Sequence, residues 1–525
     1  RRMIYNEEET NETLVKGIEA VADVVGVTLG PARNSVIIDR PDDLPPLVIN
    51  DGVTIARNIS LSKEEMVGAK LLIEVCKRAQ EKSGDGTTSA SVLANALIKE
   101  GMKLIKLGHN PTKIRADFTK LMNTLDSHIG LNASEITLDN IYAIALISAN
   151  NDDEMALRIS KIIRSIGMDS VITVEPSHTG EDEIEIVKGF EASAGYIHNV
   201  LERVNGKERR MENPLVVVSD QEVRDFEEIL PALELAKENK RPLLLVVKSI
   251  SAIALNQFVV NSMNGSIDAS IAKAEDISVW TGLKLGDLAT FLDCHYFINA
   301  LDEDIRHVRL EHLGECESLV INASSTLFIG QPSNPERVAK RCEQIVEDAH
   351  MAETEFHKKK NLARMGKLNG MAGIIKIHGE SEQEIHNKKD RLDDSLNAVR
   401  SAIQTGYTWG SGLALLKYYD IDNNPRVELD IRIGFRNALF AVFNTLYKNC
   451  VGEETTLENV MHNLSQEYAY DGIQDEWYLH APEYRVIDPV GVVCSSLRSA
   501  VSVAGYVLTA KRLIMRERHE LDRRI

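Results

Sequence analysis

The chain is poor in two residue types that often reveal the class of a protein, cysteine and the aromatic residues. Its six cysteines are scattered without a Cys-x-x-Cys pair, which disfavours a zinc cluster or a disulfide framework and favours a reducing compartment. Aromatic residues make up only 5% of the chain, so we expect an aliphatic core. A length of 525 residues exceeds what one core normally organises, and two or three domains are expected.

The chain also has fewer basic than acidic residues. The 60 basic and 79 acidic residues give a formal net charge of −19, which disfavours nucleic acid and anionic membranes as partners, because both attract basic patches. We find no run of about 18 apolar residues, and the first residues have no apolar signal-peptide core. A cytoplasmic protein without a membrane-spanning helix is therefore expected.

The Gly-x-x-x-x-Gly-Lys-Ser/Thr pattern of P-loop proteins is absent too, yet residues 84–89, Gly-Asp-Gly-Thr-Thr-Ser, form a different candidate phosphate site. They separate two segments with helical periodicity. Glycines let backbone N–H groups turn toward one point, and the start of the second helix adds partial positive charge. The Asp85 carboxylate is suited to hold Mg²⁺ against phosphate oxygens. The alternative is a plain turn in which an Asp or Thr caps the second helix.

Five further segments accompany this motif in a fixed order along the chain. They are 27–31 (Val-Thr-Leu-Gly-Pro), 49–53 (Ile-Asn-Asp-Gly-Val), 391–396 (Arg-Leu-Asp-Asp-Ser-Leu), 410–412 (Gly-Ser-Gly) and 486–489 (Val-Ile-Asp-Pro). No single motif is decisive, but the set in this order resembles the group I chaperonins, the GroEL family. The resemblance covers nearly the whole chain, from about residue 14 to residue 514.

Periodicity divides the chain into helical, mixed, α/β, mixed and helical stretches. A hairpin over 35–39 and 47–49 interrupts the first helical stretch, and a long helix is predicted over 380–404. The apolar runs 214–218 and 242–247 are typical of strands that are buried on both faces. Because phosphate motifs lie in both outer stretches, these stretches must meet in space, and the α/β part is inserted between them.

The resemblance implies a matching organisation, an α+β multidomain fold of the GroEL type. A mostly helical equatorial domain would comprise residues 1–131 and 405–525, a small mixed intermediate domain residues 132–187 and 373–404, and an α/β apical domain residues 188–372. Glycines near the domain boundaries are candidate hinges, namely Gly189, Gly370 and Gly406, and the alternative is that each is a helix C-cap or a strand bulge.

The resemblance places ATP in the equatorial domain, with Mg²⁺ on Asp85 and K⁺ as a further candidate cofactor. From the sequence alone, Asp488 before Pro489 is also typical of a helix N-cap with proline at the first helical position, and both roles can coexist. The implied ATP-binding residues are Thr28, Leu29, Gly30, Pro31, Asn50, Asp85, Gly86, Thr87, Thr88, Ser89, Gly410, Ser411, Asp471, Gly472, Ile473 and Asp488.

Hydrolysis of ATP requires a group that positions water in line with the γ-phosphate. The resemblance assigns this role to Asp394, on the long helix of the intermediate domain, and places a second acid, Asp51, near the γ-phosphate. A hinge motion would bring Asp394 to the nucleotide and couple hydrolysis to domain position. The alternative is that Asp394 is a surface acid facing Arg391, one turn earlier on the same helix.

Four residues at three places in the implied nucleotide site depart from the family pattern. Asn50 stands where the family usually has a lysine, Ser411 replaces the middle glycine of Gly-Gly-Gly, and Asp471-Gly472 replaces Asn-Ala. The phosphate segment 84–89 is intact, so we expect nucleotide binding. The missing cation at position 50 predicts weaker binding or slower turnover.

Two helical segments, 226–236 and 253–263, are apolar on more than one face. Such a helix is either fully buried or presents a second face for binding. The resemblance favours exposure in a groove for non-native polypeptides, which share exposed apolar surface and little else. The implied contact residues are Tyr196, Val200, Leu201, Leu230, Leu233, Leu255, Val259 and Val260.

Three functional hypotheses follow. The first is an ATP-dependent chaperonin, an ATPase that encloses non-native polypeptides for refolding. The resemblance implies that it forms a homo-oligomeric ring of seven subunits. A co-chaperonin that closes the ring as a lid is a possible further partner. The second is a nucleotide-binding ring with weak hydrolysis that acts as a holdase or assembly scaffold. The third, an α/β small-molecule kinase, is disfavoured because the phosphate motifs lie outside the α/β stretch. The departures from the family pattern indicate a divergent member, and a virus-encoded one would act in the host cytoplasm.

Overall fold

The computed structural model describes residues 2–32, 34–39, 46–49, 52–83, 86–149, 152–168, 171–177, 180–197, 208–274, 279–352, 354–480 and 486–516. The chain forms two compact units. The first contains residues 1–164 and 377–525, and the second, residues 165–376, is inserted between these two pieces. The finer division into three domains stays a prediction.

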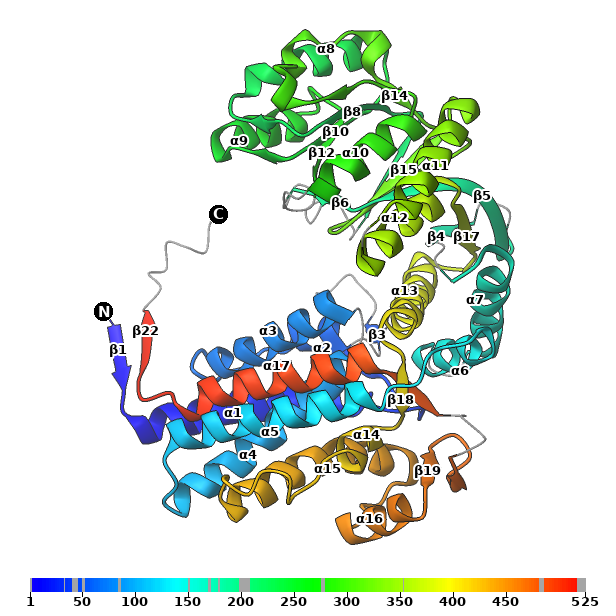
Figure 1. Cartoon of the computed structure of the whole chain (residues 1–525). Coiled ribbons are helices and arrows are strands. Elements are labelled where there is room, and N and C mark those ends of the chain that lie inside the picture. The colour runs from blue at the N-terminus through cyan, green and yellow to red at the C-terminus, as the bar shows by residue number, and fades with distance from the viewer. Residues whose placement is uncertain are drawn as a thin grey trace. The chain divides into compact units, whose positions relative to one another are not determined.

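Long helices with a shared aliphatic core build the first unit (Figure 1). At its centre, α4 (Thr87–Lys106) packs against α17 (Val490–Leu508), and both bury most of their apolar side chains. The surrounding helices are α1 (Glu7–Gly26), α3 (Glu65–Ser83), α5 (Pro111–Leu131) and α15 (Leu429–Val451).

Helix α17 bears on the expectation that the chain has no membrane-spanning helix. By length and composition it is apolar enough to cross a membrane, and 72% of its apolar window is buried inside the structure. Glycine, serines and Arg498 interrupt its apolar residues, so a search for an unbroken apolar run misses it. Its burial against α3, α4 and α5 is what the core of a helical bundle requires.

The long helix predicted over 380–404 is confirmed as α13 (Glu382–Thr405). It begins where the Ser381 hydroxyl accepts the Glu384 N–H, and it ends at Gly406, whose φ of 79° suits glycine. α13 packs on α6 (Leu138–Ser148), and the Ser395 hydroxyl donates a buried hydrogen bond of 2.9 Å to the Ala145 carbonyl.

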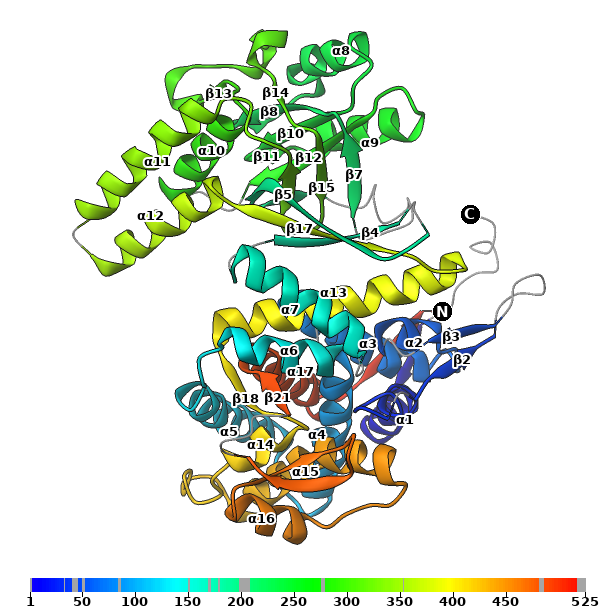
Figure 2. The same ribbon diagram turned by 90° about the vertical axis from the view of Figure 1, so that its right-hand side faces the viewer.

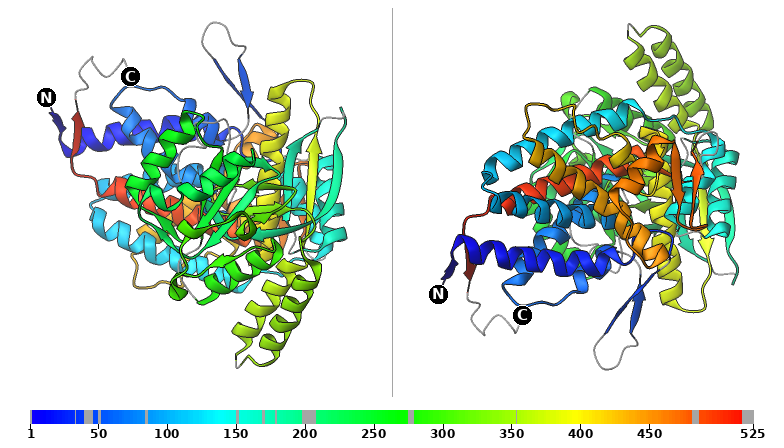
Figure 3. Two further views of the ribbon diagram at one scale, coloured as in Figure 1. Left: turned by 90° about the horizontal axis from the view of Figure 1, so that it is seen from above. Right: turned by 90° about the horizontal axis from the view of Figure 1, so that it is seen from below.

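The other elements of the first unit are short. The hairpin expected over 35–39 and 47–49 is confirmed, and Figure 3 shows its strands reaching out from the helices. The helices are α2 (Gly52–Asn58), α7 (Asp153–Ile166), α14 (Leu413–Lys417) and α16 (Leu457–Ser465). The antiparallel pairs are β1 (Arg2–Tyr5) with β22 (Leu513–Arg516), β2 (Val36–Ile38) with β3 (Leu47–Ile49), β18 (Tyr407–Trp409) with β21 (Ile487–Pro489), and β19 (Tyr468–Asp471) with β20 (Glu476–Leu479).

The second unit is an α/β layer with two six-stranded sheets and one two-stranded sheet (Figure 2). The apolar runs at 214–218 and 242–247 form parallel neighbours, β8 (Leu215–Ser219) and β10 (Leu243–Val247), which are buried throughout as predicted. Alternate residues of these strands enter two different clusters. Leu243, Leu245 and Val247 face α8 (Leu230–Glu238) and α9 (Ala252–Met263), while the residues between them face α10 (Val279–Phe291).

The remaining strands of the central sheet are β6 (Ala194–Tyr196), β12 (Ala269–Ala274), β13 (Tyr296–Phe297) and β14 (Gly314–Glu315). The second sheet has the order β4 (Val171–Pro176), β17 (Met371–Ile377), β5 (Glu183–Ala192), β16 (Thr326–Ile329), β15 (Ser318–Ile321), β7 (Arg209–Glu212). Smaller elements are β9 (Glu222–Val223), β11 (Ser249–Ile250), η1 (Phe226–Glu228), η2 (Asn299–Leu301), η3 (Ile305–His307), η4 (Leu310–His312), α11 (Pro335–His350) and α12 (Glu355–Leu368).

A buried histidine makes the stability of the first unit dependent on pH. The His480 ring stacks on Trp409 with centroids 3.9 Å apart, and burial lowers the pKa of His480 from 6.5 to about 4. The folded state therefore favours the neutral ring, so its stabilisation is present above pH 6.5 and is lost as the pH falls toward 4. In thermal melts between pH 7.5 and 4.5, His480→Phe should lose less stability than the wild type.

The exposed His462 on α16 provides the control for this measurement. His462→Phe should keep the wild-type pH dependence, because its side chain is not buried. Equal slopes of melting temperature against pH for the wild type and His480→Phe would contradict this account.

Candidate functional site

A cavity of about 240 Å³ lies in the first unit, where segments from both ends of the chain meet. Among the predicted site residues, Gly410 does not line it; the neighbouring Gly412 does. Asn50, Asp51 and Asp85 lie outside the described residues. The predicted residues that line the cavity are Thr28, Leu29, Gly30, Pro31, Gly86, Thr87, Thr88, Ser89, Asp394, Ser411, Asp471, Gly472, Ile473 and Asp488.

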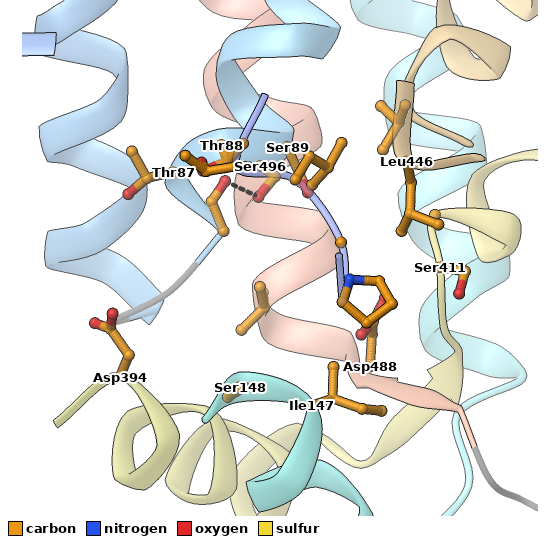
Figure 4. A pocket seen from close by; sticks show the side chains of 18 of the residues that line it. Thr87, Thr88, Ser89, Ile147, Ser148, Asp394, Ser411, Leu446, Asp488 and Ser496 are labelled. Atoms are coloured by element: carbon orange, nitrogen blue, oxygen red, sulfur yellow. Dashed lines mark hydrogen bonds between the residues drawn. The ribbon is translucent and has the colours of Figure 1, made fainter. Parts of the chain in front are cut away.

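The start of α4 faces this cavity with its first turn (Figure 4). Gly86 occupies the N-cap position with φ 89°, a left-handed conformation, and it has no side chain to cap the helix. The alternative of an Asp or Thr N-cap is therefore wrong. The first N–H groups of a helix have no acceptor within the helix, and they carry the positive end of its dipole. This turn is suited to bind an anion such as phosphate.

A second glycine turn, after α1, forms another part of the wall. Asn449 of α15 holds it in place by donating hydrogen bonds of 2.8 Å to the carbonyls of Gly26 and Leu29. Gly30 has φ 92°, and a Cβ there would lie 2.7 Å from Leu446 Cγ, so only glycine fits. Asn449 was not predicted from the sequence, because α15 carries several other polar side chains and the carbonyls that Asn449 bonds are far from it in the sequence.

Ser411 and Asp471 shape the turns on the other side of the cavity. Ser411 adopts φ 57°, and its hydroxyl donates to the Tyr470 carbonyl at 3.1 Å, so it is engaged with the protein backbone. The Asp471 carboxylate accepts N–H groups from Ile473 and Gln474 at 2.9 and 3.3 Å, which stabilises the turn. The serine in the Gly-Ser-Gly segment is therefore accommodated without its hydroxyl having to point at a ligand.

Asp488 lies in a strand and not at the start of a helix. It belongs to β21, opposite Thr408 of β18, and Pro489 occupies the N-cap position of α17. The interpretation of Asp488 as a helix N-cap is therefore wrong. β21 instead places the Asp488 carboxylate in the wall of the cavity (Figure 4).

Helix α13 contributes one face to the same cavity. Asn387, Asp390, Arg391 and Asp394 all line it, at the three- and four-residue spacing that puts side chains on one helical face. Asp394 therefore lines the cavity together with Arg391, and its role in hydrolysis stays a prediction. Arg391 donates to the Asn387 carbonyl at 3.4 Å and lies 3.7 Å from the Asp152 carboxylate. In this structure Asp394 reaches the cavity without a hinge motion.

Several other lining residues were not predicted from the sequence. Ile147 and Ser148 come from the end of α6, and Ser496 comes from α17 (Figure 4). In the part of the chain that the structure describes, no group of three His, Cys, Asp or Glu side chains is arranged to hold a metal. The carboxylate assigned to Mg²⁺, Asp85, is not in that part.

A different candidate surface lies on α8 and α9 of the second unit. Val260 and Leu230 are exposed to 57% and 38%, as predicted, and Ile253 and Met263, which were not predicted, are exposed as well. Leu233 is only 4% exposed because it packs with the buried α8 core, so its predicted exposure is wrong. Three further predicted contact residues are half-buried, namely Tyr196, Leu255 and Val259. Val200 and Leu201 lie outside the described residues.

Comparison with known proteins agrees with this architecture. Residues 21–518 match the TCP-1/cpn60 chaperonin family. The chain is 31% identical over 532 residues to a chaperonin GroEL from Methanospirillum hungatei, with 100% of this chain and 98% of that protein covered.

Two crystal forms of the chaperonin gp146 from the bacteriophage EL 2 (Pseudomonas aeruginosa), obtained in the presence of ATP-BeFx, share the fold. One form has a TM-score of 0.75 at 18% sequence identity, and the alignment covers 98% of this chain and 100% of the phage protein. The other has a TM-score of 0.66 at 19% identity, and the alignment covers 98% of this chain and 99% of the phage protein. The predicted GroEL-like fold class is confirmed. From its sequence match over nearly the whole length, the chain belongs to the TCP-1/cpn60 chaperonin family.

Proposed function

We propose that this protein is an ATP-dependent chaperonin and that the cavity of the first unit is its ATPase site. One observation carries the assignment of the site. The first turn of α4 and the carboxylate of Asp394, far apart in the sequence, line the same cavity. An anion-binding helix terminus beside a carboxylate is the arrangement that phosphoryl transfer to water requires.

The described residues fit a nucleotide. Gly30 and Gly86 are in left-handed conformations and closely packed, so backbone can approach phosphate where no side chain would fit. The first turn of α4 would bind the phosphates, and Asp488 would accept hydrogen bonds from the ribose hydroxyls. Asp394 would hold the attacking water. When bound, ATP supplies the γ-phosphate for hydrolysis, and Mg²⁺ on Asp85 would neutralise part of its charge.

The exposed apolar side chains of α8 and α9 would bind non-native polypeptides. Ile253, Val260 and Met263 are each exposed to more than half, and such side chains favour contact with any apolar segment. By analogy with its family, the protein would form a homo-oligomeric ring of seven subunits in the cytoplasm. The ring would act with or without a lid protein. K⁺ is a further candidate cofactor.

The alternative of a ring with weak hydrolysis, acting as a holdase or scaffold, now rests on Asn50, which lies outside the described residues. Ser411 no longer supports it, because its hydroxyl bonds to the Tyr470 carbonyl. The small-molecule kinase hypothesis is excluded by family membership and by the position of the cavity outside the α/β unit.

The role of Asp394 is tested by steady-state phosphate release from the wild type and Asp394→Asn. The variant should lose at least about 100-fold in turnover, because the attacking water loses the carboxylate that orients and activates it. Binding of ATP should persist. Asp393→Asn is the matched control, since Asp393 does not line the cavity. Turnover by Asp394→Asn at the wild-type rate would contradict the assignment, and an inactive wild type would favour the holdase.

Capture of clients is tested with Val260→Glu, which places a charge on the exposed face of α9. Binding of a chemically unfolded protein should fall strongly while phosphate release is retained, because α9 is in the other unit from the ATPase cavity. Leu301→Glu, at a leucine exposed to 66% outside α8 and α9, should capture clients normally. Equal capture by the two variants would argue against this surface.

The Ser411 departure is tested by titration of Ser411→Gly with Mg-ATP. We expect the dissociation constant to change less than about threefold, because the hydroxyl is already bonded to the Tyr470 carbonyl. Tightening by more than tenfold would show instead that the serine obstructs the nucleotide.

A further inference from the structure

The carbonyl of Gly86 receives a hydrogen bond from a helix near the other end of the chain. The Ser496 hydroxyl of α17 donates to the Gly86 oxygen at 3.0 Å. The same oxygen accepts the Ala90 N–H at 2.9 Å, the first bond of α4. Ser496 is 4% exposed and lines the cavity (Figure 4).

This bond fixes the peptide group that begins α4. In a planar trans peptide the carbonyl and the following N–H point in opposite directions. The Gly86 oxygen points into α4, toward Ala90, so the Thr87 N–H points out of the start of the helix. An anion at that terminus would meet this N–H. Holding the Gly86 carbonyl therefore holds the orientation of a phosphate-binding donor.

The contact between α17 and this turn leaves little room for movement. A Cβ at Gly86 would lie 2.4 Å from the Ser496 hydroxyl oxygen and 2.9 Å from Val492 Cγ1. Gly86 also has φ 89° and can rotate more freely than any other residue type. The hydrogen bond to its carbonyl thus restricts a peptide that glycine would otherwise leave free to rotate.

The beginning of α17 also contacts the end of α13. The N–H of Gly491 donates to the Thr405 hydroxyl at 2.9 Å, and the N–H of Val490 donates to the Gly406 carbonyl at 3.0 Å. The first two turns of α17 therefore connect the helix that carries Asp394 with the turn at Gly86. If this stretch of α17 moves as one body, a displacement at one contact reaches the other.

We propose that Ser496 is a positioning residue for the nucleotide phosphates and that the start of α17 links their binding to the position of α13. The inference rests on the proposed function and adds a regulatory connection within the same site. Ser496 acts through Gly86 and Thr87 and does not itself touch the reacting atoms.

Ser496→Ala is expected to fold, because the Gly86 carbonyl keeps the Ala90 N–H as its partner and no buried group is orphaned. The neighbouring Ser495→Ala is a matched control. Ser495 is buried on the same helix, and its hydroxyl has no hydrogen-bond partner among the described residues.

The experiment is steady-state ATPase kinetics with titration of Mg-ATP on the assembled protein. Ser496→Ala should raise KM and the dissociation constant about three- to tenfold, as expected for one hydrogen bond, with a smaller change in kcat. Ser495→Ala should leave all three constants unchanged. Both variants should melt within about 2 °C of each other, which separates positioning from general destabilisation.

The link to α13 is tested by a double-mutant cycle of Ser496→Ala with Thr405→Val. If α17 connects the two contacts, their effects on KM should not be additive. Additive effects would overturn the link, and wild-type constants in Ser496→Ala would overturn the positioning role. If the wild type binds no nucleotide, the proposed function fails, and this inference fails with it. If the wild type binds nucleotide but Ser496→Ala has wild-type constants, only this inference fails.

Discussion

The packing of α4 against α17 joins segments from the two ends of the chain, and the proposed nucleotide site depends on this packing. The contact is close along its length, because a Cβ at Gly86 would meet Val492 at 2.9 Å and a Cβ at Gly101 would meet Leu508 at 2.4 Å. Between these points Leu97 and Leu497 are fully buried. This interface positions the start of α4 beside β21 and the start of α17.

The same packing explains how a cavity can draw residues from so many segments. α17 continues directly from β21, which pairs with β18, and β18 follows Gly406 at the end of α13. A short antiparallel pair therefore connects the helix with Asp394 to the helix with Ser496. The proposed phosphate-binding groups and Asp394, the proposed hydrolytic carboxylate, are held by adjacent elements, which is the geometry expected of a site where chemistry and conformation are coupled.

Local patterns predicted the parts of the structure that depend on neighbouring residues. The glycines at 84–86 marked the turn between α3 and α4, periodicity located α13, and continuous apolar runs located β8 and β10. Family resemblance then assigned Asp394 to the nucleotide site, which its position on α13 alone would not have done.

Features that depend on distant partners could not be read in this way. Asp488 before proline has the local signature of an N-cap, but pairing with β18 draws it into a strand. Leu233 lies on a helix that is apolar on several faces, so periodicity could not show that it points inward. Asn449 and Ser496 are polar residues whose acceptors, the carbonyls of the two glycine turns, become apparent only in three dimensions.

The most direct test of the account is a structure of the assembled protein determined with Mg²⁺ and ADP–beryllium fluoride. We predict that the beryllium fluoride lies against the first N–H groups of α4, and that the Asp394 carboxylate faces it across the position of the attacking water. A nucleotide bound elsewhere, or no nucleotide in this cavity at saturating concentration, would contradict the assignment of the ATPase site.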